Sequence, residues 1–394
     1  MSLAEDKPIV VADSRFARFE SIKWWDQTRL KKAKVFVVGA GAIGNEVIKN
    51  LAMLGIGNLI IADMDRIEQS NLTRSVLFRE SDSGKEKAIC AARGAKQLYP
   101  DIHATPLVGN LLADAGLGVF RWADVVVGAL DNREARVFVN SSCARIGKIW
   151  IDGGIDVLNG IVRGFQAPAT ACYECTMSQV DWDVLNKRRS CSLLAQRAAA
   201  EGGTPTTPTT ASVVGAMQAQ EVVKLLHGMD ALLGRGFVFE GLNHTSYPVS
   251  YPVNPECGWH EAPAPIESTN LTSASTVREL CDTAKRLLGG LDALDFAREI
   301  VSRLECQACG EKTDVLQPAQ KISADSILCK KCNAERIPSF MHSLSADNPY
   351  LDRSLSGIGL PLWDIVWARY GEKAVGIEIS GDRAAVLGNT GMEK

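Results

Sequence analysis

Apolar runs and helical patterns alternate along residues 34–154, and this alternation predicts the core of the fold. The runs at 34–39 (KVFVVG) and 58–65 (NLIIADMD) are short and rich in apolar residues, as buried strands are. Helical patterns such as KEKAICAARGAKQL (85–98) separate them from further apolar runs at 104–109, 123–131 and 148–154. Strands that alternate with helices indicate an α/β fold, with a doubly wound, mostly parallel sheet covered by helices on both faces.

The pattern after residue 175 is more varied. Residues 212–228 predict a helix, because their apolar side chains fall on one face. The polar stretch 178–211, which includes GGTPTTPTT, has weak periodicity and predicts a long crossover loop. The segment 261–275 (EAPAPIESTNLTSAS) is typical of an interdomain linker.

Beyond the linker, Thr276 and Glu279 predict a capping box for a helix that continues to Leu288. PLWDIVWARYG (361–371) predicts a short helix, and VGIEISGDRAAVLG (375–388) predicts a hairpin about a Ser-Gly-Asp turn. We therefore expect an N-terminal domain at 1–262, a linker at 263–275 and a C-terminal domain at 276–394.

The composition is that of a folded protein with more than one domain. A chain of 394 residues exceeds what one core usually serves, and 46% hydrophobic with 23% charged residues excludes a disordered chain. The formal net charge of −3 argues against nucleic acid or an anionic membrane as a partner. The chain has no apolar run of about 18 residues and no signal peptide, so we expect a cytoplasmic protein.

A glycine-rich turn follows the first predicted strand. Gly39, Gly41 and Gly44 form G-x-G-x-x-G between a strand and a helix, and Asp63 ends the next strand. Such a turn lets the backbone approach a phosphate and directs a helix N-terminus at the anion. On its own, this motif favours a dinucleotide-dependent oxidoreductase.

The residues around the motif favour a nucleoside triphosphate instead. Arg74 and Lys87 supply two cationic side chains, and Asp131 adds a carboxylate after a later strand. Two cations and an extra acid suit a triphosphate with Mg²⁺ better than a pyrophosphate bridge. Surface charge and helix capping are the alternative roles of these residues. A nicotinamide oxidoreductase would leave all three unexplained.

Four segments carry a specific resemblance. VVGAGAIG, DMDRIEQSNLTRSVLF, GKEK and ALDN, in this order and spacing, resemble the ThiF, MoeB and ubiquitin-activating family of adenylating enzymes over about residues 12–260. The resemblance implies that residues 1–262 form a Rossmann-like, ATP-binding adenylation domain. It also implies a substrate, the C-terminal glycine of a ubiquitin-like or sulfur-carrier protein.

The resemblance also implies roles for individual residues. Asp63 would hold the ribose hydroxyls, and Asp131 would ligate Mg²⁺. Arg18 matches an arginine that reaches into the partner subunit's active site, which implies a homodimer. The phosphates would be contacted by Asn71, Arg74 and Lys87. The complete predicted nucleotide site is Gly39, Gly41, Gly44, Asp63, Asp65, Asn71, Arg74, Lys87, Asn110, Asp131 and Asn132.

The chain has 11 cysteines, which in a reducing compartment favours metal or thiol chemistry over disulfides. Two CxxC pairs with zinc-ribbon spacing predict a structural zinc site in the C-terminal domain, on Cys306, Cys309, Cys329 and Cys332. The family resemblance implies a second structural zinc, with a histidine in the fourth position, on Cys172, Cys175, Cys257 and His260. For His260, simple packing beside Trp259 is the alternative.

Four cysteines stand outside these clusters. Cys90 and Cys281 lie in apolar helical patterns, and Cys143 is expected to pack a helix against the sheet. Cys191 differs, because it lies in the polar loop beside two arginines that favour the nucleophilic thiolate. The run from Cys191 to the next helix resembles the catalytic-cysteine loop of the enzyme that activates ubiquitin-fold modifier. A spectator thiol is the alternative.

These observations predict an enzyme of a bacterial ubiquitin-like system. It would adenylate a ubiquitin-like protein, form a thioester on Cys191 and charge a conjugating enzyme. The alternative is a sulfur-carrier adenylyltransferase of thiamine or molybdopterin synthesis, and a non-catalytic scaffold is disfavoured because every expected adenylation position is filled. The expected ligands are ATP, Mg²⁺ and two Zn²⁺ per chain. We expect the C-terminal domain to dock the conjugating enzyme or the modifier.

Overall fold

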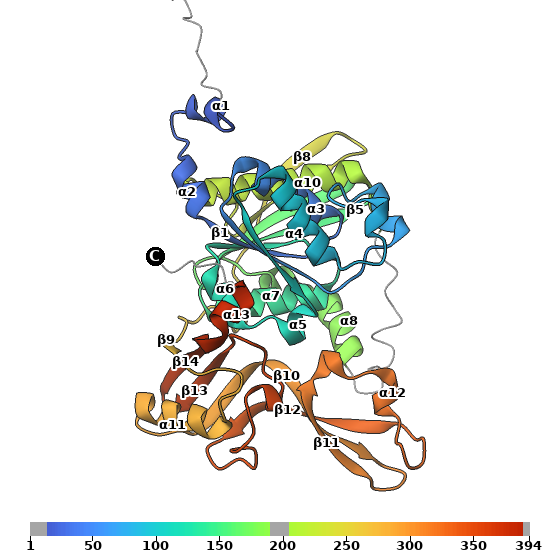
Figure 1. Ribbon diagram of the computed structural model, residues 1–394, viewed down its shortest axis with the longest axis vertical. Coiled ribbons are helices and arrows are strands. Elements are labelled where there is room, and N and C mark those ends of the chain that lie inside the picture. The colour runs from blue at the N-terminus through green and yellow to red at the C-terminus, as the bar shows by residue number, and fades with distance from the viewer. Residues whose placement is uncertain (1–13, 190–204, 389–394) are drawn as a thin grey trace, which may run out of the picture.

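The computed structural model describes residues 14–189 and 205–388, which form two β-sheets with their own helices (Figure 1). The larger sheet and most of the helices occupy the upper part of the view, and the smaller sheet lies below them. Within the described part of the chain, no helix combines the length and the apolar character that a membrane crossing needs.

The larger sheet has eight strands in the order β3-β2-β1-β4-β5-β6-β7-β8. Strands β1 to β5 are parallel, and β6 to β8 continue the sheet in antiparallel fashion. Their bounds are β1 Lys34–Val38, β2 Asn58–Asp63, β3 His103–Val108, β4 Val125–Gly128, β5 Trp150–Asp156, β6 Asn159–Phe165, β7 Arg235–Glu240 and β8 Thr245–Ser250. The strand order reverses between β1 and β4, and such a reversal opens a crevice at the carboxyl ends of the strands.

Strand β1 shows why helices cover both faces of this sheet. Val35 and Val37 belong to the core under α3 (Ala42–Leu54), α4 (Lys87–Leu98) and α10 (Pro208–Leu226). Phe36 and Val38 belong to the opposite core, under α5 (Leu111–Asp114), α6 (Leu117–Trp122) and α7 (Arg133–Arg145). All four side chains are buried because alternate residues of a strand point to opposite faces. The predicted α/β fold with a doubly wound, mostly parallel sheet is confirmed.

The smaller sheet has six strands, in the order β11-β10-β13-β14-β9 with β12 paired to β10. The strands are β9 Ile266–Thr269, β10 Ala293–Cys306, β11 Lys312–Pro318, β12 Arg336–Ser345, β13 Ile365–Tyr370 and β14 Lys373–Ile379. Helix α11 (Val277–Leu288) packs on β13 and β14. The predicted capping box is confirmed, because Thr276 Oγ1 accepts from the Glu279 N–H and the Thr276 N–H donates to Glu279 Oε2.

The stretch 178–211 is not a continuous loop. Helix α8 covers Gln179–Arg189, and α10 begins at Pro208 rather than at residue 212. The Ser178 N–H and hydroxyl donate to Asp181 Oδ2 at 2.9 and 2.7 Å, and Leu185 is buried in the core under α7. A local cap and one buried side chain hold α8, whose hydrophobic pattern is too weak to predict a helix.

Two further predictions are wrong in the C-terminal part. The predicted helix at 361–371 contains strand β13, and the predicted hairpin at 375–388 is the end of β14 followed by helix α13 (Arg383–Leu387). Residues 365–368 are all buried, so β13 lacks the polar alternation that marks a strand. The predicted linker at 263–275 contains β9, a short edge strand that pairs in parallel with β14.

The two sheets meet where the chain before β13 packs on α6. The Gly118 N–H donates to the Trp363 carbonyl at 2.9 Å, and the Leu117 N–H donates to Asp364 Oδ1 at 2.9 Å. A Cβ at Gly118 would overlap the indole of Trp363, which is buried in the same core as Phe36. The smaller sheet is therefore packed against the layer of α5, α6 and α7 that covers one face of the larger sheet (Figure 1).

Candidate functional site

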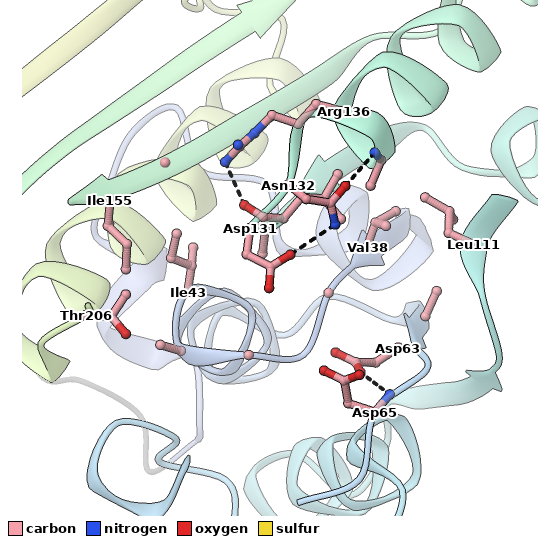
Figure 2. A pocket seen from close by; sticks show the side chains of 18 of the residues that line it. Val38, Ile43, Asp63, Asp65, Leu111, Asp131, Asn132, Arg136, Ile155 and Thr206 are labelled. Atoms are coloured by element: carbon pink, nitrogen blue, oxygen red, sulfur yellow. Dashed lines mark hydrogen bonds between the residues drawn. The ribbon is translucent and has the colours of Figure 1, made fainter. Parts of the chain in front are cut away.

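A cavity of about 620 Å³ opens at the carboxyl ends of the parallel strands, and we call it the strand-end cavity (Figure 2). In Figure 2 it extends from Ile155 and Thr206 on one side to Leu111 on the other. Ligands of open α/β sheets bind at this place, outside the point where the strand order reverses. The predicted nucleotide-site residues that line it are Gly39, Gly41, Asp63, Asp65, Asn71, Arg74, Lys87, Asn110, Asp131 and Asn132.

The glycine-rich turn forms the floor of the cavity. Gly39 has a φ of +97° and lies against Ala129, so a side chain would be strained and would overlap the Ala129 carbonyl. Gly44 does not line the cavity, and its role is packing, because a Cβ there would overlap the Gly39 carbonyl. Gly41 is the N-cap of α3, with open space where a side chain would be. The N-terminus of α3 is therefore accessible to an anion.

Asp63 and Asp65 lie at the end of β2. Asp63 Oδ2 accepts from the Ala40 N–H at 2.7 Å, and Oδ1 accepts from the Asp65 N–H at 2.8 Å. Burial raises the pKa of Asp63 above its ordinary value, although the nearby Lys87 opposes this shift. Lys87 is the first residue of α4, and its Nζ pairs with Asp65 Oδ2 at 2.7 Å. The structure thus holds a largely buried cation beside a carboxylate at the cavity.

Asn71 and Arg74 come from the short 3-10 helix η1 (Gln69–Thr73) and the residue after it. Asn71 Oδ1 accepts from the Glu68 N–H at 3.1 Å, and Arg74 Nη1 donates to the Ser70 carbonyl at 2.7 Å. These local bonds give both side chains a defined place at the cavity rim. A second cation therefore faces the cavity from a segment different from that of Lys87.

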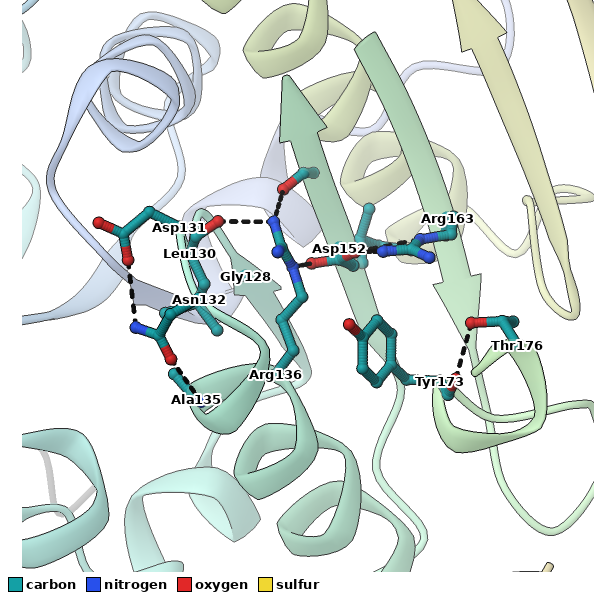
Figure 3. Close-up of polar contacts among 12 residues, drawn as sticks. Gly128, Leu130, Asp131, Asn132, Ala135, Arg136, Asp152, Arg163, Tyr173 and Thr176 are labelled. Atoms are coloured by element: carbon teal, nitrogen blue, oxygen red, sulfur yellow. Dashed lines mark hydrogen bonds and ion pairs between the residues drawn. The ribbon is translucent and has the colours of Figure 1, made fainter. Parts of the chain in front are cut away.

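Asp131 and Asn132 follow β4, and their side chains make different contacts (Figure 3). Asn132 Oδ1 accepts from the Ala135 N–H at 2.8 Å and caps α7, while its Nδ2 donates to Asp131 Oδ1 at 3.1 Å. The helix cap therefore belongs to Asn132, and the Asp131 carboxylate faces the cavity. Asn110 is likewise a cap, because its Oδ1 accepts from the Leu112 N–H at 2.9 Å.

Two cavity-lining arginines were missed by the sequence analysis. Arg136 donates to the carbonyls of Leu130 and Gly153 at 2.6 and 3.1 Å, and its Nε pairs with Asp152 at 2.9 Å (Figure 3). Arg163 pairs with the other oxygen of Asp152. Burial alone would lower the pKa of Arg163, but the pairing with Asp152 raises it. An aspartate inside the apolar run KIWIDGG was the available signal, because a buried carboxylate needs cationic partners.

Four other residues that the sequence singles out, Arg18, Cys90, Cys143 and Cys281, do not line the strand-end cavity. Arg18 is exposed on the short helix α1 (Ala17–Glu20) and does not line the strand-end cavity of its own chain. Cys191 lies outside the described residues, so its place at the site stays a prediction. Cys90, Cys143 and Cys281 are buried as predicted, and burial raises the pKa of each thiol, which disfavours the thiolate.

The first cysteine tetrad lies beside α7 and consists of Cys172, Cys175, Cys257 and His260. Cys172 Sγ lies 3.8 Å from Cys175 Sγ and 3.6 Å from Cys257 Sγ, and Cys175 Sγ lies 3.0 Å from His260 Nε2. A tetrahedral zinc ion with Zn–S bonds of about 2.3 Å sets its sulfur ligands about 3.8 Å apart. The donor set and its spacing therefore fit such an ion, with the His260 ring nitrogen directed at the cluster rather than packed away.

The ribbon tetrad lies at the ends of β10 and β12, on Cys306, Cys309, Cys329 and Cys332. The Cys306–Cys332 and Cys309–Cys329 sulfur pairs are 3.4 and 3.6 Å apart. The backbone N–H of Lys331 points at Cys329 and helps to lower the pKa of this thiol to about 6. The four sulfur atoms lie close enough together to surround one tetrahedral ion, so this tetrad also fits zinc.

The fold and the strand-end cavity define a class, an α/β protein with a phosphate-binding turn at the switch point of its sheet. Comparison with known families narrows this class. The ThiF family matches residues 14–258, well over half of the sequence, and the chain belongs to this family. The resemblance stated from the sequence motifs is confirmed.

Two relatives resemble most of this family region. The SAMP-activating enzyme E1 of Haloferax volcanii is 31% identical over 270 residues, covering 65% of this chain and 91% of that protein. The sulfur carrier protein adenylyltransferase of Thermus thermophilus is 32% identical over 237 residues, covering 59% and 83%. The chain is an enzyme of this activating, adenylating kind.

A solved structure supports the fold. The crystal structure of E. coli MccB with ATP superposes with a TM-score of 0.53 at 23% identity, covering 66% of this chain and 77% of MccB. At this identity the likeness concerns the fold alone.

Proposed function

We propose that this chain uses ATP to adenylate the C-terminal glycine of a small ubiquitin-like or sulfur-carrier protein. The observation that carries this proposal is the set of side chains and backbone groups that line the strand-end cavity. It combines an open helix N-terminus at Gly41, a partly buried acid at Asp63, two cations from separate segments and the carboxylate of Asp131. The relatives named as an activating enzyme and as an adenylyltransferase support it, as does the shared fold of MccB, which was crystallised with ATP.

Each residue would contribute to binding or to charge. Asp63 would accept hydrogen bonds from the ribose hydroxyls, and Asn71, Arg74 and Lys87 would contact the phosphates. Asp131 would ligate Mg²⁺, because its carboxylate faces the cavity and carboxylate oxygens are ligands that Mg²⁺ prefers. A bound Mg²⁺ would offset part of the negative charge of the triphosphate. Arg136 holds the Leu130 carbonyl and so keeps Asp131 in place.

The reaction follows from this arrangement. A carboxylate oxygen of the carrier protein attacks the α-phosphorus of ATP, and the bond to the bridging oxygen of pyrophosphate breaks. Negative charge shifts onto the phosphate oxygens, where Arg74 and Lys87 stabilise it. The products are an acyl-adenylate and pyrophosphate.

The next step distinguishes two versions of the proposal. In modifier conjugation, the Cys191 thiolate attacks the carbonyl carbon, AMP leaves, and the resulting thioester is passed to a conjugating enzyme. A ribbon tetrad and a second sheet beyond the family region favour this version, because adenylation alone does not require them. In sulfur transfer, the adenylate is the substrate of a sulfur donor, and the Thermus relative favours this alternative.

The other parts of the chain receive structural roles. Each cysteine tetrad would hold one Zn²⁺, and residues 276–394 would form an interaction domain that docks the conjugating enzyme or the modifier. Arg18 would act in the active site of a second copy of the chain in a homodimer, which agrees with its absence from the lining of the cavity in its own chain.

ATP–pyrophosphate exchange tests the adenylation step. The full chain is incubated with labelled pyrophosphate, ATP, Mg²⁺ and candidate β-grasp proteins that end in glycine. We expect exchange with one carrier and none with the same carrier lacking its terminal glycine. Equal exchange with and without the terminal glycine would contradict the proposal that this glycine is the substrate.

The thiol step needs a separate experiment. Cys191→Ala should keep pyrophosphate exchange and lose a reductant-sensitive covalent adduct with the carrier, because the adduct requires the sulfur. Cys281→Ala is the matched control, since Cys281 is buried in the smaller-sheet core. An adduct that persists in Cys191→Ala would make Cys191 a spectator. Mass spectrometry separates a thioester from an acyl disulfide by one sulfur atom.

A further inference from the structure

Gln320 brings a side chain from the C-terminal region into the strand-end cavity. It lies in the 3-10 turn η5 (Ala319–Lys321) that follows β11, and it lines the cavity together with residues of the larger sheet. Among the cavity-lining residues that the structure describes, Gln320 alone comes from beyond residue 258, where the ThiF match ends. The family region by itself therefore leaves one wall of the cavity incomplete.

Contacts from the smaller sheet hold η5 against α5. Ala319 is buried in a cluster with Val301 and Leu304 of β10, which anchors the turn. Lys321 Nζ pairs with Asp114 Oδ1 at the end of α5, at 2.7 Å. Both charged groups are partly exposed, so this pair orients the turn more than it stabilises it.

Arg298 ties α5 to the same sheet from below. Its guanidinium donates to the carbonyls of Leu112 and Ala115, at 2.8 and 3.1 Å, and pairs with Asp364 at 3.1 Å. The side chains of Arg298 and Asp364 are each 1% exposed, so the pair is shielded from solvent and counterions. Helix α5 and turn η5 are thus parts of one packed wall.

If the cavity binds ATP, as the proposed function holds, this wall lies where the base of the nucleotide would be. Phosphates at the N-terminus of α3 would lie near Ile43, and the ribose would lie at Asp63. Figure 2 shows Ile43, Asp63 and Leu111 following one another across the cavity in that order. A nucleotide placed this way extends its base toward Leu111, the first residue of α5, against which the turn of Gln320 packs.

The side-chain amide of Gln320 has unused hydrogen-bonding capacity. Its Oε1 is shielded from solvent and accepts no hydrogen bond from the described residues, so turning the amide toward the cavity breaks no bond to this oxygen, whereas Asn110 uses its Oδ1 to cap α5. A side-chain amide offers an acceptor and a donor side by side, which matches the amino group and adjacent ring nitrogen of adenine. We propose that Gln320 is a specificity-determining residue that reads the adenine base, so that the C-terminal region forms part of the nucleotide site.

Gln320→Met tests this proposal, because methionine keeps the side-chain length and removes both hydrogen-bonding atoms. We expect the full-length variant to bind ATP about tenfold more weakly in calorimetry, and to lose a similar factor of preference for ATP over GTP. Gln317→Met is the matched control, since Gln317 is exposed on β11 and does not line the cavity. It should bind both nucleotides as the wild type does.

The melting temperature of the nucleotide-free protein is a second measurement, and it should not fall although the affinity for ATP does. Gln320→Met should melt at or above the wild-type temperature, because an unpartnered buried oxygen is removed, whereas a purely structural role would lower it. Unchanged ATP affinity and ATP-over-GTP preference, in a wild type that binds ATP, would overturn this inference and leave the proposed function standing. A wild type that binds neither nucleotide would overturn both.

Discussion

The strand-end cavity and the first cysteine tetrad are built in opposite ways. The cavity collects single side chains from many strand ends, and several of them, such as Asn132 and Arg74, are held by hydrogen bonds within their own short segments. The tetrad joins two segments about 85 residues apart, and its donor atoms face one another. A change in the cavity should therefore remove chemistry and keep the fold, whereas a change in the tetrad should remove a link that holds the fold.

The largest expected effect is in the cavity. Asp131→Ala should lower pyrophosphate exchange by about a thousandfold, because it removes the proposed Mg²⁺ ligand. Its melting temperature should stay within about 2 °C of the wild type, since the cap on α7 belongs to Asn132. The exposed Asp101 provides the control variant Asp101→Ala, which should behave as the wild type. Near-normal exchange by a folded Asp131→Ala protein would refute the assignment of Mg²⁺ to this residue.

The second largest expected effect is at the first cysteine tetrad. Cys172→Ser should lose one of two zinc ions per chain and destabilise the protein by about 3 kcal/mol, because Cys172 is fully buried and links both segments. Elemental analysis and denaturant unfolding measure the two quantities. Cys281→Ser is the control for loss of a buried thiol, and it should keep both ions. If Cys172→Ser retains two zinc ions per chain, Cys172 is not a zinc ligand.

A smaller effect concerns the pH dependence of the cavity. Burial raises the pKa of Asp63, so on acidification this carboxyl is protonated at a higher pH than an ordinary aspartate, whose pKa is about 3.9. The protonated group loses an acceptor for the ribose, so the KM for ATP should rise severalfold as the pH falls through that raised value. Asp63→Asn should show a weak, pH-independent affinity over the same range. If the KM for ATP of Asp63→Asn rises at low pH as much as that of the wild type, a group other than Asp63 titrates.

The smallest expected effect is at the ribbon tetrad. Cys309→Ser should lose the second zinc ion and change pyrophosphate exchange by no more than about twofold, because Cys309 is partly exposed and does not line the cavity. Transfer to a conjugating enzyme should decline if residues 276–394 dock that partner. A large loss of exchange in Cys309→Ser would show that the ribbon shapes the wall that carries Gln320.

Local signals explain which parts of the fold and site could be predicted. Gly39 directly follows one buried strand and Asp63 ends the next one, and parallel strands bring their carboxyl ends to one edge, so their meeting in the cavity was predictable. The helix at 179–189 was not predictable, because it depends on a cap at Ser178 and one buried leucine. Strand β13 was mistaken for a helix because neighbours pack on both of its faces.

The sequence by itself determined the family and the phosphate-binding turn, and it predicted the ribbon tetrad and the charges of the cavity, because these depend on residue types at short spacings. The first tetrad was implied by the family resemblance. Only the tertiary structure decided that Asn132 rather than Asp131 caps α7, that Arg136 and Arg163 share Asp152, and that Gln320 reaches the cavity. The physical reason is distance along the chain. Gln320 and Leu111 are brought together by the buried Arg298–Asp364 pair and the packing of Trp363, and no sequence spacing records such contacts.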